Sequence, residues 1–248
     1  MLGVIGGSGL DRFKELQIND RKVVSTPYGS PSSALAFGTV DGQSLVFLPR
    51  HGDDHSIAPH RINYRANLWA LHAHGVREIV AVAAVGGITA PMATGLLVVP
   101  DQIIDYTHGR EATFFDGIAN PLQHVDFTMP FSKSLRKRLL DTGHFAGAKL
   151  HDGGTYGATQ GPRLETAAEI DRMERDGADI VGMTGMPEAV LARELDLDYA
   201  MLALVVNAAA GRGDSAREIS MAEIQAVAGE GMGQVRQIIR LMVSPSGR

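Results

Sequence analysis

Short runs of hydrophobic residues, many of them β-branched, alternate along the chain with longer segments in which hydrophobic residues recur every three or four positions. The short runs predict β-strands, and the longer segments predict amphipathic helices. Strands are expected at residues 2–5, 35–37, 44–48, 78–84, 97–104, 179–183 and 198–206. Helices are expected at residues 63–74, 166–176, 187–195 and 220–243. This alternation is typical of an α/β protein in which helices pack on a central sheet.

Two of the predicted helices carry end signals. Gly177 follows the helix at 166–176 as a stop residue, and Ser220-x-x-Glu223 forms a capping box at the start of the last helix. The apolar residues expected on one face of that helix are Met221, Ile224, Val227, Met232, Val235, Ile239 and Met242. No repeat, low-complexity tract or linker interrupts the sequence, so we expect a single domain spanning residues 1–248.

Composition excludes several classes of protein. The chain has 248 residues, 44% of them hydrophobic and 21% charged, with a net charge of −5. Because Lys and Arg form no long cluster, nucleic acids and anionic membranes are poor partner candidates. The absence of cysteine rules out disulfides, thiolate catalysis and Cys-ligated metals. The first ten residues lack a basic start, and no apolar run reaches about 18 residues, so a cytoplasmic enzyme is expected.

A glycine-rich turn is the first candidate for binding an anion. Gly6-Gly7-Ser8-Gly9 follows the first predicted strand, but it lacks the third glycine of a dinucleotide fingerprint and the lysine of a P-loop. Backbone N–H groups of such a turn, together with the Ser8 hydroxyl, can surround a phosphate. A plain tight turn explains the same glycines.

Arg50 and His51 begin a second polar loop. The Arg50 guanidinium offers paired N–H donors and His51 adds another, and both groups suit phosphate. A metal site is the alternative, since His51 and His55 are four residues apart with two aspartates between them. Pro49 and Gly52 disfavour the helix that would place both rings on one face. An ordinary solvated loop is the third interpretation.

Three further polar groups stand at the ends of predicted elements. Asn207 follows the apolar run 199–206, where α/β proteins bind ligands, and its amide complements the carbonyl and N–H edge of a 6-oxopurine. The alternative for Asn207 is a turn residue that ends the strand. Thr184 follows another strand, where it suits either a phosphate oxygen or a helix cap. Glu165 either contacts a ligand or interacts favourably with the dipole of the following helix.

Together these motifs resemble the trimeric purine nucleoside phosphorylase family, in its methylthioadenosine phosphorylase branch. The matching motifs occur in order over nearly the whole chain and are Gly6-Gly7-Ser8-Gly9-Leu10, Arg50-His51-Gly52-x-x-His55, Pro59-x-x-x-Asn63-Tyr64-x-Ala66-Asn67, Gly161-Pro162-Arg163 and Met183-Thr184-x-x-Pro187-Glu188. The resemblance implies a single-domain α/β nucleoside phosphorylase fold with a central, mixed, twisted and barrel-like sheet flanked by helices. It also implies a homotrimer, no metal or cofactor, and inorganic phosphate as nucleophile and co-substrate.

The resemblance assigns roles by position. The phosphate-binding positions are Ser8, Arg50, His51 and Thr184. The positions for the ribose and its 5′ substituent are Met183, His55 and His124, with His124 supplied by a neighbouring subunit. The purine-binding positions are Ala84, Val85, Gly86, Glu165 and Asn207, of which Glu165 and Asn207 are the expected catalytic residues. The pattern departs at Ala83, where the family often has a phosphate-binding threonine.

The base site departs from the branch more strongly. Methylthioadenosine phosphorylases have Asp, Ser and Asp at the positions of Asn207, Glu165 and Ala209, whereas Asn207 and Glu165 resemble the pair that 6-oxopurine phosphorylases place against the base. Hypoxanthine presents an O6 acceptor and an N1–H donor, which an amide N–H and a carboxylate complement. Adenine presents the reverse pattern, and each buried unpaired group costs ~1 to 3 kcal/mol.

We therefore expect a pentosyltransferase that cleaves S-methyl-5′-thioinosine with phosphate, giving hypoxanthine and 5-methylthioribose 1-phosphate, with nucleoside and phosphate as its small-molecule partners. Three alternatives stay open. An inosine and guanosine phosphorylase would prefer a 5′-hydroxyl, and a methylthioadenosine phosphorylase would prefer the 6-amino base. A non-catalytic purine-nucleoside binding protein would bind its ligand without phosphate dependence.

Overall fold

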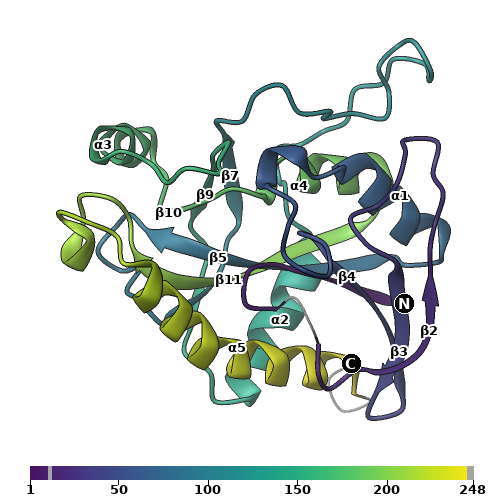
Figure 1. The fold of residues 1–248 in the computed structure, drawn as a ribbon, viewed down its shortest axis with the longest axis horizontal. Coiled ribbons are helices and arrows are strands. Elements are labelled where there is room, and N and C mark those ends of the chain that lie inside the picture. The colour runs from purple at the N-terminus through teal and green to yellow at the C-terminus, as the bar shows by residue number, and fades with distance from the viewer. Residues whose placement is uncertain (11–12, 245–248) are drawn as a thin grey trace.

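One mixed sheet of eleven strands carries the fold in the computed structural model, which describes residues 1–10 and 13–244 (Figure 1). The strands are β1 (Leu2–Gly6), β2 (Gln17–Lys22), β3 (Leu35–Val40), β4 (Gln43–Pro49), β5 (Glu78–Gly87), β6 (Leu97–Val99), β7 (Gln102–Asp105), β8 (Leu150–Asp152), β9 (Thr155–Ala158), β10 (Ile180–Gly182) and β11 (Asp198–Ala208). The helices are α1 (Tyr64–Ala73), α2 (Lys133–Phe145), α3 (Ala167–Asp176), α4 (Gly185–Glu194) and α5 (Met221–Val243). None of the described helices is long and apolar enough to cross a membrane.

The sheet branches at its central strand, β5. One path runs in the order β2-β3-β4-β1-β5-β10-β9-β7, while β11 pairs with β5 and leads to β6 and then β8. The pairs β1–β4, β1–β5 and β5–β11 are parallel. The carboxyl ends of these four strands therefore meet at one edge of the sheet, where α/β proteins place their ligands.

Alternating side chains bury both faces of the sheet. In β11, Tyr199, Met201 and Val205 pack in the same core cluster as residues of α1 and α4. The intervening Leu202 and Leu204 pack in a second cluster with residues of α2 and α5. Figure 1 shows α1 and α4 on one side of β5 and β11, and α2 and α5 on the other. A strand that is buried on both faces has hydrophobic residues at consecutive positions in the sequence, which explains why the sequence predicts β11 so clearly.

The helices predicted from the sequence are confirmed to within two residues at each end. Gly177 ends α3 in the left-handed conformation, with φ 95°. At the start of α5, the Ser220 hydroxyl accepts from the backbone N–H of Glu223, which is one of the two hydrogen bonds of the predicted capping box. Of the apolar face expected on α5, Met232 is fully buried, but Met221 is 57% exposed, so the prediction was wrong at the first turn.

One predicted strand was wrong, and several elements were not predicted. The segment 97–104 is two strands, because the chain leaves β6 at Pro100 and Asp101 before β7 pairs with β9 in the other branch of the sheet. Proline has no N–H to continue a ladder. The elements without a prediction are β2, β8, β9 and α2.

Candidate active site

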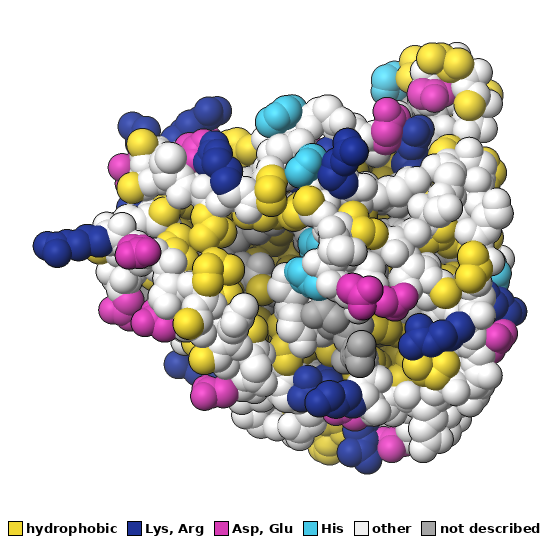
Figure 2. All heavy atoms as spheres, viewed as in Figure 1, with side chains coloured by type: hydrophobic (Ala, Val, Ile, Leu, Met, Phe, Trp, Pro, Cys, Tyr) yellow, Lys and Arg dark blue, Asp and Glu magenta, His cyan; other side chains and the backbone are white. Residues whose placement is uncertain are grey.

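The carboxyl ends of β1, β4, β5 and β11 meet at a cleft of about 470 Å³. Figure 2 shows this face hollowed, with hydrophobic side chains along the hollow and histidine side chains beside it. The volume is within the range of ~300 to 1,000 Å³ that is usual for small-molecule sites. The predicted site residues that line the cleft are Ser8, Arg50, His51, His55, Ala84, Val85, Gly86, Glu165, Met183, Thr184 and Asn207. His124 lies apart from them, exposed in the connection between β7 and α2.

The glycine-rich turn packs against Arg50. The N–H of Leu10 donates to the carbonyl oxygen of Gly7 at 2.9 Å, so these glycines do form a tight turn, and Gly7 and Ser8 also line the cleft. A Cβ atom at Gly7 would lie 2.4 Å from the backbone carbonyl oxygen of Val82 and 2.8 Å from Arg50 Nη1. Glycine is therefore required there for the turn to approach the guanidinium.

His51 is held by the loop that follows it. Its Nδ1 atom lies 2.8 Å from the carbonyl oxygen of Ile57, and because that oxygen can only accept, Nδ1 carries the hydrogen. The rings of His51 and His55 stack with their centroids 4.5 Å apart, in a segment that forms a turn and not a helix. Within residues 1–10 and 13–244, no group of three or more His, Asp or Glu side chains is arranged to hold a metal ion.

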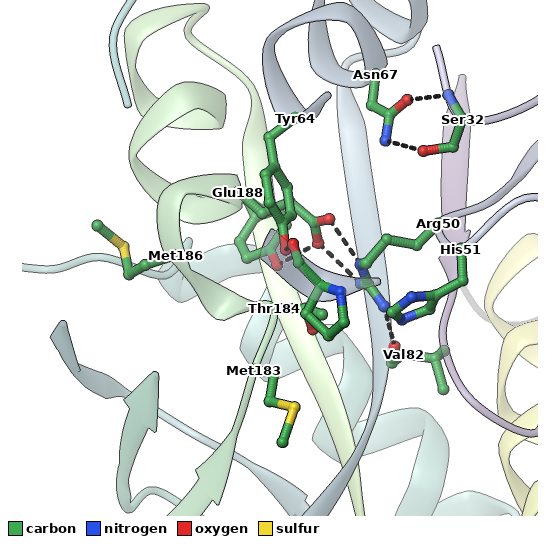
Figure 3. A network of polar contacts seen from close by, with 12 residues as sticks. Ser32, Arg50, His51, Tyr64, Asn67, Val82, Met183, Thr184, Met186 and Glu188 are labelled. Atoms are coloured by element: carbon green, nitrogen blue, oxygen red, sulfur yellow. Dashed lines mark hydrogen bonds and ion pairs between the residues drawn. The ribbon is translucent and has the colours of Figure 1, made fainter. Parts of the chain in front are cut away.

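A buried ion pair occupies the paired donors of Arg50. Arg50 Nε donates to Glu188 Oε1 at 2.8 Å and Nη2 donates to Oε2 at 2.9 Å, as Figure 3 shows. Nη1 donates to the carbonyl oxygen of Val82, and the hydroxyl of Tyr199 donates to Glu188 Oε2 at 2.9 Å. Both charged side chains are fully buried. Arg50 thus enters the cleft from a position fixed by α4, β5 and β11.

Burial and charge act together on this cluster. Burial, and then the negative charge of Glu188, raise the pKa of Tyr199 well above its usual value. Burial alone would lower the pKa of Arg50, but attraction to Glu188 outweighs that effect and leaves the pKa raised. At neutral pH Arg50 is therefore charged and Tyr199 is protonated.

This arrangement corrects one detail of the sequence interpretation. Paired N–H donors of Arg50 were expected to bind phosphate, but Nε and Nη2 donate to Glu188. Three of the five N–H groups that a guanidinium carries are used by Glu188 and Val82, which leaves two on the Nη atoms. The role of Arg50 toward phosphate stays a prediction, and it depends on those two N–H groups.

Thr184 begins α4 without capping it through its side chain. It occupies the N-cap position, but among the described residues its side chain makes no capping hydrogen bond. Its backbone N–H donates to the hydroxyl of Tyr156 at 3.2 Å. The interpretation of the Thr184 side chain as a helix cap is therefore wrong.

Asn207 lies inside β11, which continues to Ala208, so the prediction of a strand-ending residue is wrong. The pairing with β5 shifts register between Val205 and Asn207, and such an irregularity changes the direction of the side chain that follows it. Asn207 Nδ2 donates to the carbonyl oxygen of Ala208 at 2.6 Å. Asn207 lines the cleft, and among the described residues its side chain makes no other hydrogen bond, which leaves one amide N–H and Oδ1 for a ligand.

Glu165 lies in the loop between β9 and α3. The helix begins at Ala167 with Thr166 as its N-cap, and Glu169 supplies the first-turn carboxylate and completes a capping box with Thr166. Glu165 is therefore not a first-turn residue of α3, and Glu169 occupies the position that the helix-dipole alternative gave to Glu165. The Thr159 hydroxyl donates to Glu165 Oε1 at 2.6 Å.

Arg110 supports the site, although no motif in the sequence indicated it. Its guanidinium donates to the carbonyl oxygens of Met183 at 2.9 Å, Met186 at 2.6 Å, Thr159 at 3.1 Å and Gln160 at 2.8 Å. These bonds connect the chain after β9 with the chain after β10. Arg110 thus fixes the backbone that carries Met183 beside the cleft.

Comparisons with known proteins identify the family of this chain. The sequence profile of the phosphorylase superfamily matches residues 1–244. A probable S-methyl-5′-thioinosine phosphorylase from Pseudomonas syringae pv. tomato is 50% identical over 243 residues, 98% of either chain. A 6-oxopurine nucleoside phosphorylase from Pyrococcus furiosus is 44% identical over 90% of this chain and 84% of that one.

A solved structure extends the comparison to the fold. Methylthioadenosine phosphorylase from Schistosoma mansoni in complex with adenine superposes with a TM-score of 0.91 at 31% identity, covering 96% of this chain and 89% of that one. The expectation of a mixed α/β phosphorylase fold is confirmed. The chain is an enzyme that belongs to the phosphorylase superfamily.

Proposed function

We propose that this enzyme cleaves S-methyl-5′-thioinosine with inorganic phosphate, giving hypoxanthine and 5-methylthioribose 1-phosphate. The observation that carries the proposal is the pairing of Asn207 and Glu165 in one cleft with Ser8, His51 and Thr184. An amide and a carboxylate suit the edge of a 6-oxopurine, and the hydroxyls and imidazole suit a phosphate. All of these residues belong to one sheet or its connections, so we also propose that they act within a single domain.

The base is recognised by the hydrogen-bond donors and acceptors of Asn207 and Glu165 that remain for a ligand. Asn207 has one amide N–H for O6 of hypoxanthine and Oδ1 for the N7–H that forms as the base leaves. Glu165 accepts from N1–H. With adenine, the lone pair on N1 would face the carboxylate of Glu165, and the 6-amino group would face the amide N–H of Asn207.

The reaction is a substitution at C1′ of the ribose. A phosphate oxygen forms a bond to C1′ while the bond from C1′ to N9 breaks, and the electron pair moves to the purine, which takes up a proton at N7. Ser8, His51, Thr184 and the two remaining N–H groups of Arg50 would hold the phosphate in line with C1′. Asn207 would stabilise the purine most strongly as charge moves onto it.

The part of the cleft that we propose for the 5′ substituent of the ribose is partly apolar. His55 and Met183 line the cleft, as do apolar side chains that include Ile57 and Ile224, and such a surface suits a methylthio group.

We propose a homotrimer in which His124 of the partner subunit completes the end of the cleft that holds the 5′ substituent. Sedimentation of the intact protein tests the assembly, and a monomer that is fully active would contradict it.

A second candidate is a 6-oxopurine phosphorylase that prefers a 5′-hydroxyl, favoured by the 44% identity to the enzyme from Pyrococcus furiosus. Phosphorolysis of methylthioinosine, methylthioadenosine, inosine and guanosine, each with and without phosphate, separates the candidates. We expect methylthioinosine to have the highest kcat/KM and every turnover to require phosphate. Preference for inosine would select the second candidate, and binding without turnover would indicate a nucleoside-binding protein.

A further inference from the structure

Thr159 contacts Glu165 from outside the substrate cleft. It directly follows β9, and its side chain is buried, with 7% exposed. Glu165 lines both the cleft and a second cavity of about 600 Å³, whereas Thr159 lines only the second of the two. Thr159 therefore reaches the carboxylate without standing in the way of a ligand.

The hydroxyl proton of Thr159 has one well-placed acceptor. Thr159 Oγ1 lies 2.6 Å from Glu165 Oε1 and 3.3 Å from the carbonyl oxygen of Gly182. That carbonyl oxygen already accepts from the backbone N–H of Thr159 at 2.8 Å. Because a hydroxyl carries a single proton, the short bond to Glu165 is the one that it makes.

This bond restrains a carboxylate that the backbone leaves free to turn. Glu165 precedes the N-cap of α3, so no helix orders its side chain. A donor on Oε1 selects one orientation and leaves Oε2 for a ligand.

We propose that Thr159 is a positioning residue that sets the base preference by holding Glu165 as an acceptor for N1–H of a 6-oxopurine. The inference rests on the proposed function. A 6-aminopurine has no hydrogen on N1, so it would need Glu165 to donate. Glu165 would then carry a proton on Oε2, and Oε1 would accept from Thr159 as part of a neutral carboxylic acid, which is a weaker acceptor than a carboxylate. The hydroxyl thus opposes the binding of adenine nucleosides without contacting them.

Thr159→Val tests the proposal, since valine keeps the shape and removes the hydroxyl. Loss of one hydrogen bond to a charged group predicts a fall of about tenfold or more in kcat/KM for methylthioinosine. The kcat/KM for methylthioadenosine falls less, so the ratio of kcat/KM for methylthioinosine to that for methylthioadenosine decreases by a similar factor. The KM for phosphate stays unchanged. Thr159→Ser restores the preference, and Thr159→Ala reproduces the effect of valine if valine impairs folding.

A double-mutant cycle with Glu165→Ala separates this inference from the proposed function, since alanine removes the acceptor of the Thr159 hydroxyl. If Thr159 acts through Glu165, Thr159→Val causes no further loss in the Glu165→Ala background, whichever nucleoside is the best substrate. Additive losses would overturn the positioning role, as would equal losses on the two bases. If the unmodified enzyme does not prefer methylthioinosine to methylthioadenosine, the proposed function and the base-selecting role fail together, while the cycle still decides whether the two residues are coupled.

Discussion

Replacing Glu188 by glutamine should destabilise the enzyme strongly although it changes almost no volume. The Glu188 carboxylate accepts two hydrogen bonds from Arg50 and one from Tyr199. A glutamine has one oxygen, and its amide N–H₂ would face the N–H groups of Arg50. The variant also leaves the guanidinium charge buried without a counter-ion. Breaking a buried pair in this way costs ~3 to 5 kcal/mol.

Urea denaturation at one fixed protein concentration measures this loss, provided that the slope with denaturant is unchanged. Arg50→Met serves as the matched partner, and the double variant should lose less than the sum of the two single losses by ~1 to 3 kcal/mol. The KM for phosphate should rise in Glu188→Gln, because Arg50 loses the contact that orients it. A loss below ~1 kcal/mol, or strictly additive losses, would refute the account of this pair.

Two other predictions concern the base and the start of α3. Asn207→Asp combined with Glu165→Ser and Ala209→Asp should shift kcat/KM from methylthioinosine toward methylthioadenosine by at least ~tenfold, since donors and acceptors are exchanged with little change in volume at Asn207. An unchanged substrate ratio in a folded triple variant would contradict this. Hydrogen bonding from Arg163 lowers the pKa of Glu169 from 4.5 to about 2, so its contribution to stability is present above pH 4.5 and is lost as the pH falls toward 2. Because the site is exposed, the contribution is under ~1 kcal/mol. Glu169→Gln should reduce the fall in the free energy of unfolding between those pH values by that amount. Equal dependence of the free energy of unfolding on pH in the variant and the unmodified protein would contradict this prediction.

The sequence predicts those elements of the fold whose burial is regular. β11 is buried on both faces and α3 ends in a left-handed glycine, and both are readable from residue types alone. β2 is exposed along its whole length, so it lacks the hydrophobic alternation on which strand prediction depends. α2 did carry a signal, with Ser132 as its cap and Leu135 and Leu139 buried four residues apart.

The site residues that were predicted stand next to glycine-rich turns or at strand ends, where local sequence indicates a function. Glu188 was named as part of a family motif and was given no role in the site, because its partner Arg50 is 138 residues away in the sequence and no local pattern connects them. Thr159 and Arg110 were missed for a related reason: their roles depend on which backbone and side-chain atoms the sheet brings together. Such contacts are properties of the tertiary fold.

The ratio of kcat/KM for methylthioinosine to that for methylthioadenosine, measured at saturating phosphate, tests the central claim most directly. In the proposed function Asn207 and Glu165 complement the 6-oxopurine edge, and each mismatched group is expected to cost ~1 to 3 kcal/mol with adenine. The account therefore predicts a ratio of about 100 or more in favour of methylthioinosine. A ratio near one, or one that favours methylthioadenosine, would show that Asn207 and Glu165 do not recognise the base in this way.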